Sequence, residues 1–101
     1  MKSYLFVYGT LTDAQIREKI LGYHAPLYPA RLSGFRMSTI WIAGTEYPIL
    51  IEDVERGEVI QGGYFMLNPE DVLKMDAYES DAYRRKRVKL ENGIHAWVYY
   101  K

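Results

Sequence analysis

The feature that most constrains the fold is a run of apolar and aromatic residues, 4–8, that ends at Gly9. A run without polar alternation is typical of a strand that is buried on both faces in the centre of a sheet. Glycine permits unusual backbone conformations and lets main-chain N–H groups approach a ligand closely. Thr10 and Leu11 then lead to a helix start. Such a unit could hold a small anion, although many strand–glycine units only turn the chain.

Two segments carry the signals of short helices. The first, residues 13–21, is expected to have Thr12 as its N-cap within a capping box and to stop at Gly22. The second begins after Asn68, with a proline at the first helical position and acidic residues in the first turn. Each helix has a limited apolar side, formed by Ala14, Ile16, Ile20 and Leu21 in the first and by Val72, Leu73 and Met75 in the second.

Most of the remaining chain consists of short segments typical of strands. We predict strands near residues 30–32, 35–42, 49–51, 59–67, 84–90 and 95–100. Ser33-Gly34 would join the first two as a hairpin, and Asn92-Gly93 is a strong hairpin turn near the end. The glycine pair 62–63 indicates a bulge, a tight barrel bend or a backbone that a ligand approaches. The order predicts an α+β domain whose sheet is curled or closed as a barrel.

The totals narrow the class of protein. A length of 101 residues predicts a single domain over residues 1–101. Formal net charge is zero, so no overall field attracts nucleic acid or an anionic membrane. The chain has no cysteine, which excludes disulfides and thiolate chemistry. No signal peptide or bilayer-spanning run is visible, so we expect a cytoplasmic protein. His24 and His95 lack metal-ligand spacing, and no metal site is predicted.

Residues 84–89 form a basic run that admits two interpretations. In a strand, Arg85 and Arg87 share one face and Arg84 lies on the other. The run could be a nucleic-acid patch, but a solvated strand face fits the zero net charge better. One of these arginines could still turn inward and brace a carboxylate, and the pattern does not say which.

Glu79 is the candidate for acid–base chemistry. It follows Asp76 by three residues at the end of the second helix, so the two can share a face. Acids in such places are usually solvated. Here Tyr78 and Tyr83 flank the segment, and a glutamate held among tyrosines loses hydration. Its pKa would then rise toward neutrality, where a carboxylate can shuttle protons.

Several segments together resemble the gamma-glutamylcyclotransferase-like (AIG2-like) family. The resembling segments are Phe6-Val7-Tyr8-Gly9-Thr10-Leu11, Tyr47-Pro48 before an apolar run, Leu73-Lys74-Met75-Asp76-Ala77-Tyr78-Glu79, Tyr83-Arg84-Arg85 and Ala96-Trp97-Val98-Tyr99. Their order and spacing match the family over nearly the whole chain. The resemblance implies a small mixed β-barrel of about six to seven strands with two short helices.

The resemblance also implies an activity and a site. The activity is an acyltransferase-type cyclisation that releases 5-oxoproline from a γ-glutamyl amine, amino acid or peptide and needs no cofactor or metal. Glu79 matches the family's acid–base glutamate, and the loop Tyr8-Gly9-Thr10-Leu11 matches the part that binds the glutamyl end. Tyr83 is our candidate for a supporting hydroxyl near the glutamate, whereas Tyr8 is expected to wall the pocket.

Two departures and two alternatives stay open. Many members have glycine after the glutamate, and Ser80 stands here, so the local turn could differ. The short loop at 43–46 could leave the pocket open on the leaving-group side. The chain could be a non-catalytic module that binds a glutamyl-like small molecule on the same fold. A nucleic-acid module is the more distant alternative. The leaving amine, pathway and oligomeric state are not specified by the sequence.

Overall fold

A computed structural model describes residues 3–101, which form six strands, two α-helices and short 3-10 turns. The strands are β1 (Ser3–Val7), β2 (Tyr28–Ile42), β3 (Thr45–Glu52), β4 (Glu58–Leu67), β5 (Arg84–Lys89) and β6 (His95–Tyr100). The helices are α1 (Ala14–Leu21) and α2 (Val72–Glu79), and the 3-10 turns are Thr10–Thr12, Pro69–Asp71 and Ser80–Ala82. Residues 1–2, on which part of the signal-peptide prediction falls, lie outside the described range.

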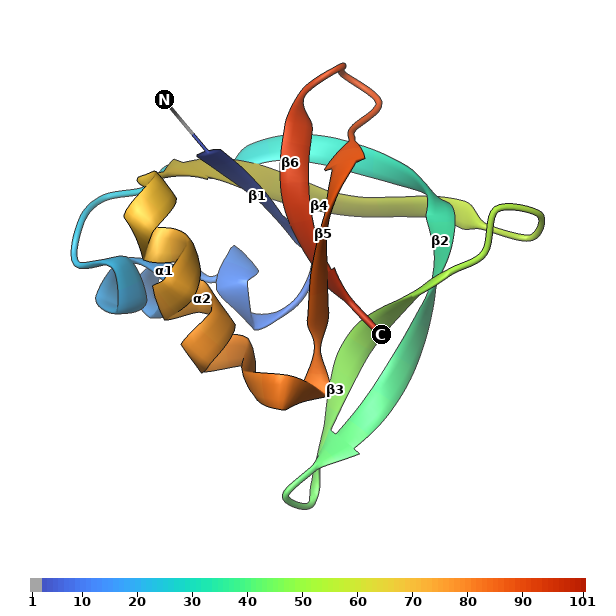
Figure 1. Cartoon of the computed structure of the whole chain (residues 1–101), viewed down its shortest axis with the longest axis horizontal. Coiled ribbons are helices and arrows are strands. Elements are labelled where there is room, and N and C mark those ends of the chain that lie inside the picture. The colour runs from blue at the N-terminus through green and yellow to red at the C-terminus, as the bar shows by residue number, and fades with distance from the viewer. Residues whose placement is uncertain (1–2) are drawn as a thin grey trace.

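All six strands belong to one mixed sheet in the order β3-β2-β4-β1-β6-β5. Every neighbouring pair is antiparallel except β1 and β6, which run parallel. The sheet curls into a half-barrel, and both helices lie together on one side of it (Figure 1). The prediction of an α+β fold with a curled sheet and two short helices is confirmed. No helix in the described part of the chain is long and apolar enough to cross a membrane.

The first strand is buried on both faces, as its apolar run predicts. Leu5 and Val7 pack in a core with the helices, together with Met75 of α2. Phe6 points to the other side and packs in the core enclosed by the curled sheet, with Leu50 of β3 among its neighbours. Because β1 lies between β4 and β6, it carries the loop that follows it to the middle of the molecule.

The predicted hairpin at Ser33-Gly34 is wrong. β2 runs through this position as a single strand, and its pairing with β4 only shifts register between Leu32 and Phe35. Gly34 takes a positive φ of 87°, which suits a bulge as well as a turn. The hairpin turn lies instead at Ala43-Gly44, where both residues have positive φ, and it joins β2 to β3.

The first helix begins one residue later than predicted. Asp13, not Thr12, is the N-cap, and its Oδ1 accepts hydrogen bonds from the N–H groups of Gln15 (2.8 Å) and Ile16 (3.3 Å). Thr12 donates its hydroxyl to the carbonyl of Gly9 at 2.6 Å, so it braces the preceding turn instead. The predicted stop is confirmed, because Gly22 ends α1 in the left-handed conformation.

The glycine pair of β4 allows close packing of the protein on itself. A Cβ at Gly62 would lie 2.3 Å from the carbonyl oxygen of Val7. A Cβ at Gly63 would lie 2.6 Å from the side chain of Leu27. Both glycines pair regularly with β2. The alternative that a ligand approaches the backbone here is therefore not needed to explain the two glycines.

Candidate functional site

A cavity of about 230 Å³ lies between the end of β1, the β2–β3 hairpin and the C-terminal end of α2. It is lined by Phe6, Val7, Tyr8, Gly9, Thr10, Leu11, Ile42, Tyr47, Pro48, Tyr78, Glu79, Ser80, Tyr83 and Tyr99. All six site residues predicted from the sequence are among them: Tyr8, Gly9, Thr10, Leu11, Glu79 and Tyr83. The fold thus brings them to one place, and their chemical roles remain predictions.

The loop after β1 forms one 3-10 turn. Its two hydrogen bonds run from the N–H of Thr12 to the carbonyl of Gly9 (3.0 Å) and from the N–H of Asp13 to the carbonyl of Thr10 (3.1 Å). The N–H groups of Thr10 and Leu11 therefore have no partner within the turn. Leu11 is buried in the core beneath the helices and anchors the turn against the sheet.

Gly9 faces Pro48 of β3. A Cβ at Gly9 would lie 3.0 Å from Cγ of Pro48, so the Pro48 ring would have to shift by a few tenths of an ångström to accommodate a larger residue. Both residues line the cavity. The glycine thus keeps the β1 loop and the β3 wall close together, which is a reason for glycine that the strand–glycine pattern alone does not reveal.

Glu79 is the last residue of α2 and the one acidic side chain among the described residues that lines the cavity. It is half-buried, and its carboxylate makes no hydrogen bond or ion pair within residues 3–101. Burial raises the pKa of Glu79 from 4.5 to about 7. A carboxyl group with this pKa can both accept and release a proton near neutral pH.

Two of the tyrosine hydroxyls around the cavity are hydrogen-bonded to main-chain carbonyls of the protein itself. Tyr8 donates to the carbonyl of Tyr99 at 2.7 Å, and Tyr83 donates to the carbonyl of Pro48 at 3.1 Å. Burial, followed by the nearby Glu79 carboxylate, raises the pKa of Tyr83 to about 12, so its hydroxyl stays protonated at neutral pH. In this structure the Tyr83 hydroxyl holds β3, and no hydrogen bond joins it to Glu79.

Arg85 is the arginine that braces a carboxylate. Its Nε and Nη2 donate to the two oxygens of Asp76 at 2.9 and 3.1 Å, and its Cζ lies 4.1 Å from the ring centre of Trp97. Tyr99 donates its hydroxyl to the same carboxylate at 2.6 Å. Burial acts to raise the pKa of Asp76, but the hydrogen bonds from Arg85 and Tyr99 outweigh it and leave this pKa below its ordinary value.

The predicted alternation of the basic strand is confirmed. Arg85 and Arg87 both lie over Trp97, whereas Arg84 lies over Tyr100 on the other face. The cavity lining includes no arginine.

Ser80, directly after Glu79, has φ 62° and ψ −172°. This region is essentially reserved for glycine and costs about 1–3 kcal/mol for other residues. The turn therefore has a glycine-type backbone although serine occupies it. Ser80 lines the cavity, so the strain lies at the candidate site itself.

Eight residues that line the cavity were not among the predicted site residues: Phe6, Val7, Ile42, Tyr47, Pro48, Tyr78, Ser80 and Tyr99. Tyr47-Pro48 belongs to the resembling motifs, and that was a usable signal. Tyr99 reaches the cavity because β6 pairs in parallel with β1. Parallel neighbours far apart in sequence leave no local signal.

The fold and the site define a small half-barrel domain that presents one partly desolvated carboxylate to a cavity. The chain belongs to the gamma-glutamyl cyclotransferase, AIG2-like family, whose model matches residues 5–101. A comparison with curated proteins finds no match.

Solved structures share the fold at low sequence identity. A protein described as a gamma-glutamyl cyclotransferase superposes with a TM-score of 0.81 at 16% identity, over 99% of this chain and 66% of that one. An AIG2-like protein from Mus musculus superposes with a TM-score of 0.72 at 19% identity, over 99% of this chain and 77% of that one. An Arabidopsis thaliana protein superposes with a TM-score of 0.78 at 22% identity, over 98% of this chain and 68% of that one. This chain thus spans about two thirds to three quarters of these relatives.

Proposed function

We propose that the protein is a γ-glutamyl cyclotransferase that releases 5-oxoproline from a γ-glutamyl amine or a γ-glutamyl amino acid or peptide, with Glu79 as the proton shuttle. The observation that carries the proposal is the unpaired Glu79 carboxylate, whose pKa is about 7, in the same cavity as the turn after Gly9. Membership of the gamma-glutamyl cyclotransferase, AIG2-like family supports the reaction class.

In the proposed reaction the nucleophile belongs to the substrate. The α-amine attacks the γ-carbonyl carbon, a C–N bond closes the five-membered ring, and the C–N bond to the leaving amine breaks. Glu79 takes one proton from the α-ammonium before the attack and passes it to the leaving nitrogen. The ring nitrogen loses a second proton as it becomes the lactam N–H, and the departing amine takes up this proton to leave as an ammonium, so the protons balance. Oriented intramolecular reactions gain roughly 7–11 kcal/mol of barrier, which explains how such a site works without a protein nucleophile.

The remaining task of the site is to fold the substrate toward Glu79. We propose that N–H groups of the turn after Gly9, those of Thr10 and Leu11, hold the α-carboxylate. Donors placed where charge develops on the carbonyl oxygen would also lower the barrier. Ile42 and Pro48 supply apolar walls to the cavity. The partner is accordingly a small molecule, and the zero net charge gives no support to nucleic acid or membrane binding.

The test is 5-oxoproline release from a panel of γ-glutamyl amines and γ-glutamyl amino acids, with wild type beside Glu79→Gln. We expect turnover by wild type on at least one substrate and a loss of about 100-fold or more in kcat for the variant, the usual scale of a general acid–base group. Circular dichroism establishes that the variant is folded. Absence of turnover on the whole panel, with saturable binding of glutamate-like ligands, would indicate the non-catalytic binding module instead.

A further inference from the structure

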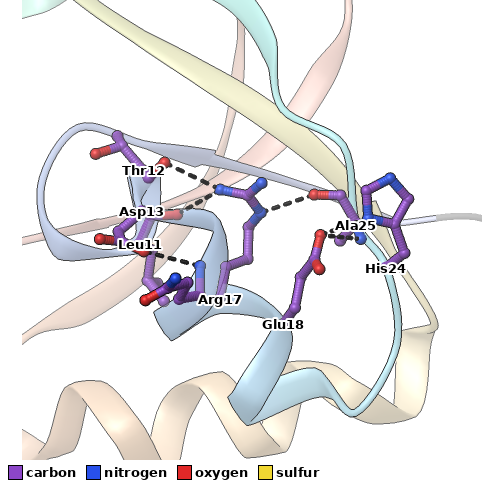
Figure 2. A network of polar contacts seen from close by, with 8 residues as sticks. Leu11, Thr12, Asp13, Arg17, Glu18, His24 and Ala25 are labelled. Carbon is purple, nitrogen blue, oxygen red and sulfur yellow. Dashed lines mark hydrogen bonds and ion pairs between the residues drawn. The ribbon is translucent and has the colours of Figure 1, made fainter.

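Arg17 of α1 is a buried charge behind the candidate site. Its side chain is 3% exposed, and it does not belong to the cavity lining. The guanidinium lies between the backbone of residues 11–12 and Ala25, as Figure 2 shows. It therefore contacts the back of the turn whose other side forms part of the cavity.

The guanidinium is bonded to main-chain carbonyls. Nη1 donates to Leu11 and Thr12 at 3.0 and 3.1 Å, and Nε donates to Ala25 at 2.7 Å. In a 3-10 turn the carbonyls point toward one end and the free N–H groups toward the other. Arg17 thus fixes the carbonyl end of the turn, and the free N–H groups of Thr10 and Leu11 face away from it.

No carboxylate within residues 3–101 forms an ion pair with Arg17. Glu18, its chain neighbour, accepts from the N–H of Ala25 and pairs with His24 instead. A buried cation without an ion-pair partner is costly to the fold. The three carbonyls and the ring of Phe65, whose centre lies 5.5 Å from Cζ of Arg17, offset part of this cost. The cation also leaves the turn with a positive charge in a region of low dielectric, where that charge acts strongly on a nearby anion.

We propose that Arg17 is a positioning residue for the carboxylate of the bound ligand. It holds the turn after Gly9 in its shape and supplies the positive charge that an α-carboxylate on the far side of the turn satisfies. The inference rests on the proposed function for the identity of the ligand, a glutamyl or 5-oxoproline carboxylate. Arg17 does not touch the ligand and acts through the turn.

The competing explanation is that Arg17 only joins the turn to the segment around Ala25 for stability. The two explanations differ in one measurable respect. A structural brace affects every ligand of the cavity alike, whereas a carboxylate-positioning residue affects only ligands that carry the carboxylate. The lactams 5-oxoproline and 2-pyrrolidinone differ in just this group.

The experiment measures binding of both lactams, by NMR titration, to wild type, Arg17→Lys and Glu18→Gln. Arg17→Lys keeps the charge but loses the planar fork that spans the carbonyls. We expect this variant to weaken the binding of 5-oxoproline about tenfold, because the turn then holds the carboxylate less well. The affinity for 2-pyrrolidinone should change less than about twofold. Glu18→Gln is the matched control, because it disturbs the same Ala25 segment from the neighbouring residue; both affinities should stay at the wild-type values.

Equal weakening of both lactams, or unchanged affinity for 5-oxoproline, would overturn the inference. The same titration on wild type gives a reading that needs no variant. The Arg17 Nε–H resonance should shift with 5-oxoproline and stay in place with 2-pyrrolidinone, and an unmoved resonance with both counts against the role. If Arg17→Lys does not fold, this resonance decides.

Turnover separates this inference from the proposed function. If wild type binds 5-oxoproline and Arg17→Lys weakens it, but no γ-glutamyl substrate is turned over, the enzyme proposal fails and the role of Arg17 stands. If substrates are turned over, Arg17→Lys should raise KM about tenfold and leave kcat within about twofold. A fall in kcat at constant KM would contradict a role in carboxylate binding.

Discussion

Glu79 differs from the other acidic side chains in its surroundings rather than in its position on a helix. Asp76, one turn earlier on α2, has hydrogen bonds from Arg85 and Tyr99, and its pKa is below the ordinary value. Glu79 is buried among tyrosines without such a donor, and its pKa rises to about 7. Two carboxylates three residues apart are thus shifted in opposite directions, which separates the one that stays charged from the one that exchanges protons.

The first prediction concerns the pH dependence of catalysis. If ionised Glu79 is the base, kcat/KM should rise with pH through about 7 and level off above it. At about pH 5.5 kcat/KM should be roughly 30-fold below the plateau, because only about one thirtieth of the Glu79 carboxyl groups are ionised at that pH. Initial rates at subsaturating substrate measure it. A profile that is flat between about pH 5.5 and 7.5 would contradict the assignment.

The same pKa makes a prediction for stability. The folded-state pKa lies above the unfolded value of 4.5, so folding takes up a proton between these values and stability falls as pH rises from about 4.5 to 7. Glu79→Gln removes this loss. We expect the variant to match wild type near pH 4 and to exceed it by up to roughly 3 kcal/mol near pH 8. Urea unfolding of wild type and variant at both pH values measures this. The same difference in unfolding free energy between the two proteins at pH 4 and at pH 8 would refute the prediction.

Ser80 gives a third prediction at this scale. Ser80→Gly relieves the backbone strain of φ 62° and ψ −172°, and should stabilise the protein by about 1–2 kcal/mol. Ala82→Gly is the matched control in the same turn, because Ala82 is not among the residues with positive φ. It should destabilise by about 0.5–1 kcal/mol through chain entropy. Thermal unfolding of both variants measures the two changes in stability, which should have opposite signs. Changes of the same sign in both variants would exclude strain at Ser80.

At the scale of elements, α2 is fixed by its contacts with the β5–β6 hairpin. The bidentate pair of Arg85 with Asp76, the stacking of Arg85 on Trp97 and the hydroxyl of Tyr99 join the helix to both strands. Asp76 and Glu79 lie nearly one turn apart, so fixing the first limits the movement of the second. The basic strand thus supports the site from outside the cavity.

Asp76→Asn tests this support. The variant keeps the shape of the side chain and loses its charge, so we expect stability to fall by about 1–2 kcal/mol. Since Glu79 would then be less well placed, kcat/KM should fall about tenfold. Glu70→Gln, an exposed acid of the turn before α2, is the control and should change neither quantity. Loss of stability with unchanged kcat/KM would show that the pair serves the fold alone.

For the molecule as a whole, the half-barrel is joined along a seam between its edge strand β3 and the β5–β6 hairpin. The N–H of Lys101 donates to Leu50 of β3 at 2.9 Å, and Nζ of Lys86 in β5 lies 3.0 Å from Glu52 of β3. Tyr83, just before β5, adds its bond to Pro48. The candidate cavity lies at this seam, since Pro48 and Tyr83 also line it.

The parts of this architecture that the sequence predicts are those with local causes. The apolar run 4–8 predicts the buried first strand, and Asn92-Gly93 predicts the final hairpin, where Gly93 has φ 90°. Gly34 has the same positive φ but lies in a bulge, because β4 pairs with both sides of it. In the sequence nothing distinguishes Arg17 from other helix residues. Its role depends on the backbone of residues 11–12 and on Ala25, which only the fold brings into contact with it. Contacts between distant segments decide these cases, and a single sequence does not record them.

Tyr83→Phe tests whether the seam shapes the site. The lost hydrogen bond to Pro48 should cost about 1 kcal/mol of stability and speed amide exchange in β3. KM should rise severalfold. The value of kcat should change little, because the hydroxyl holds a wall of the cavity and moves no proton. Tyr28→Phe, an exposed tyrosine outside the cavity, is the control and should leave exchange and kinetics unchanged. If kcat collapses at constant KM instead, the hydroxyl acts together with Glu79 during proton transfer.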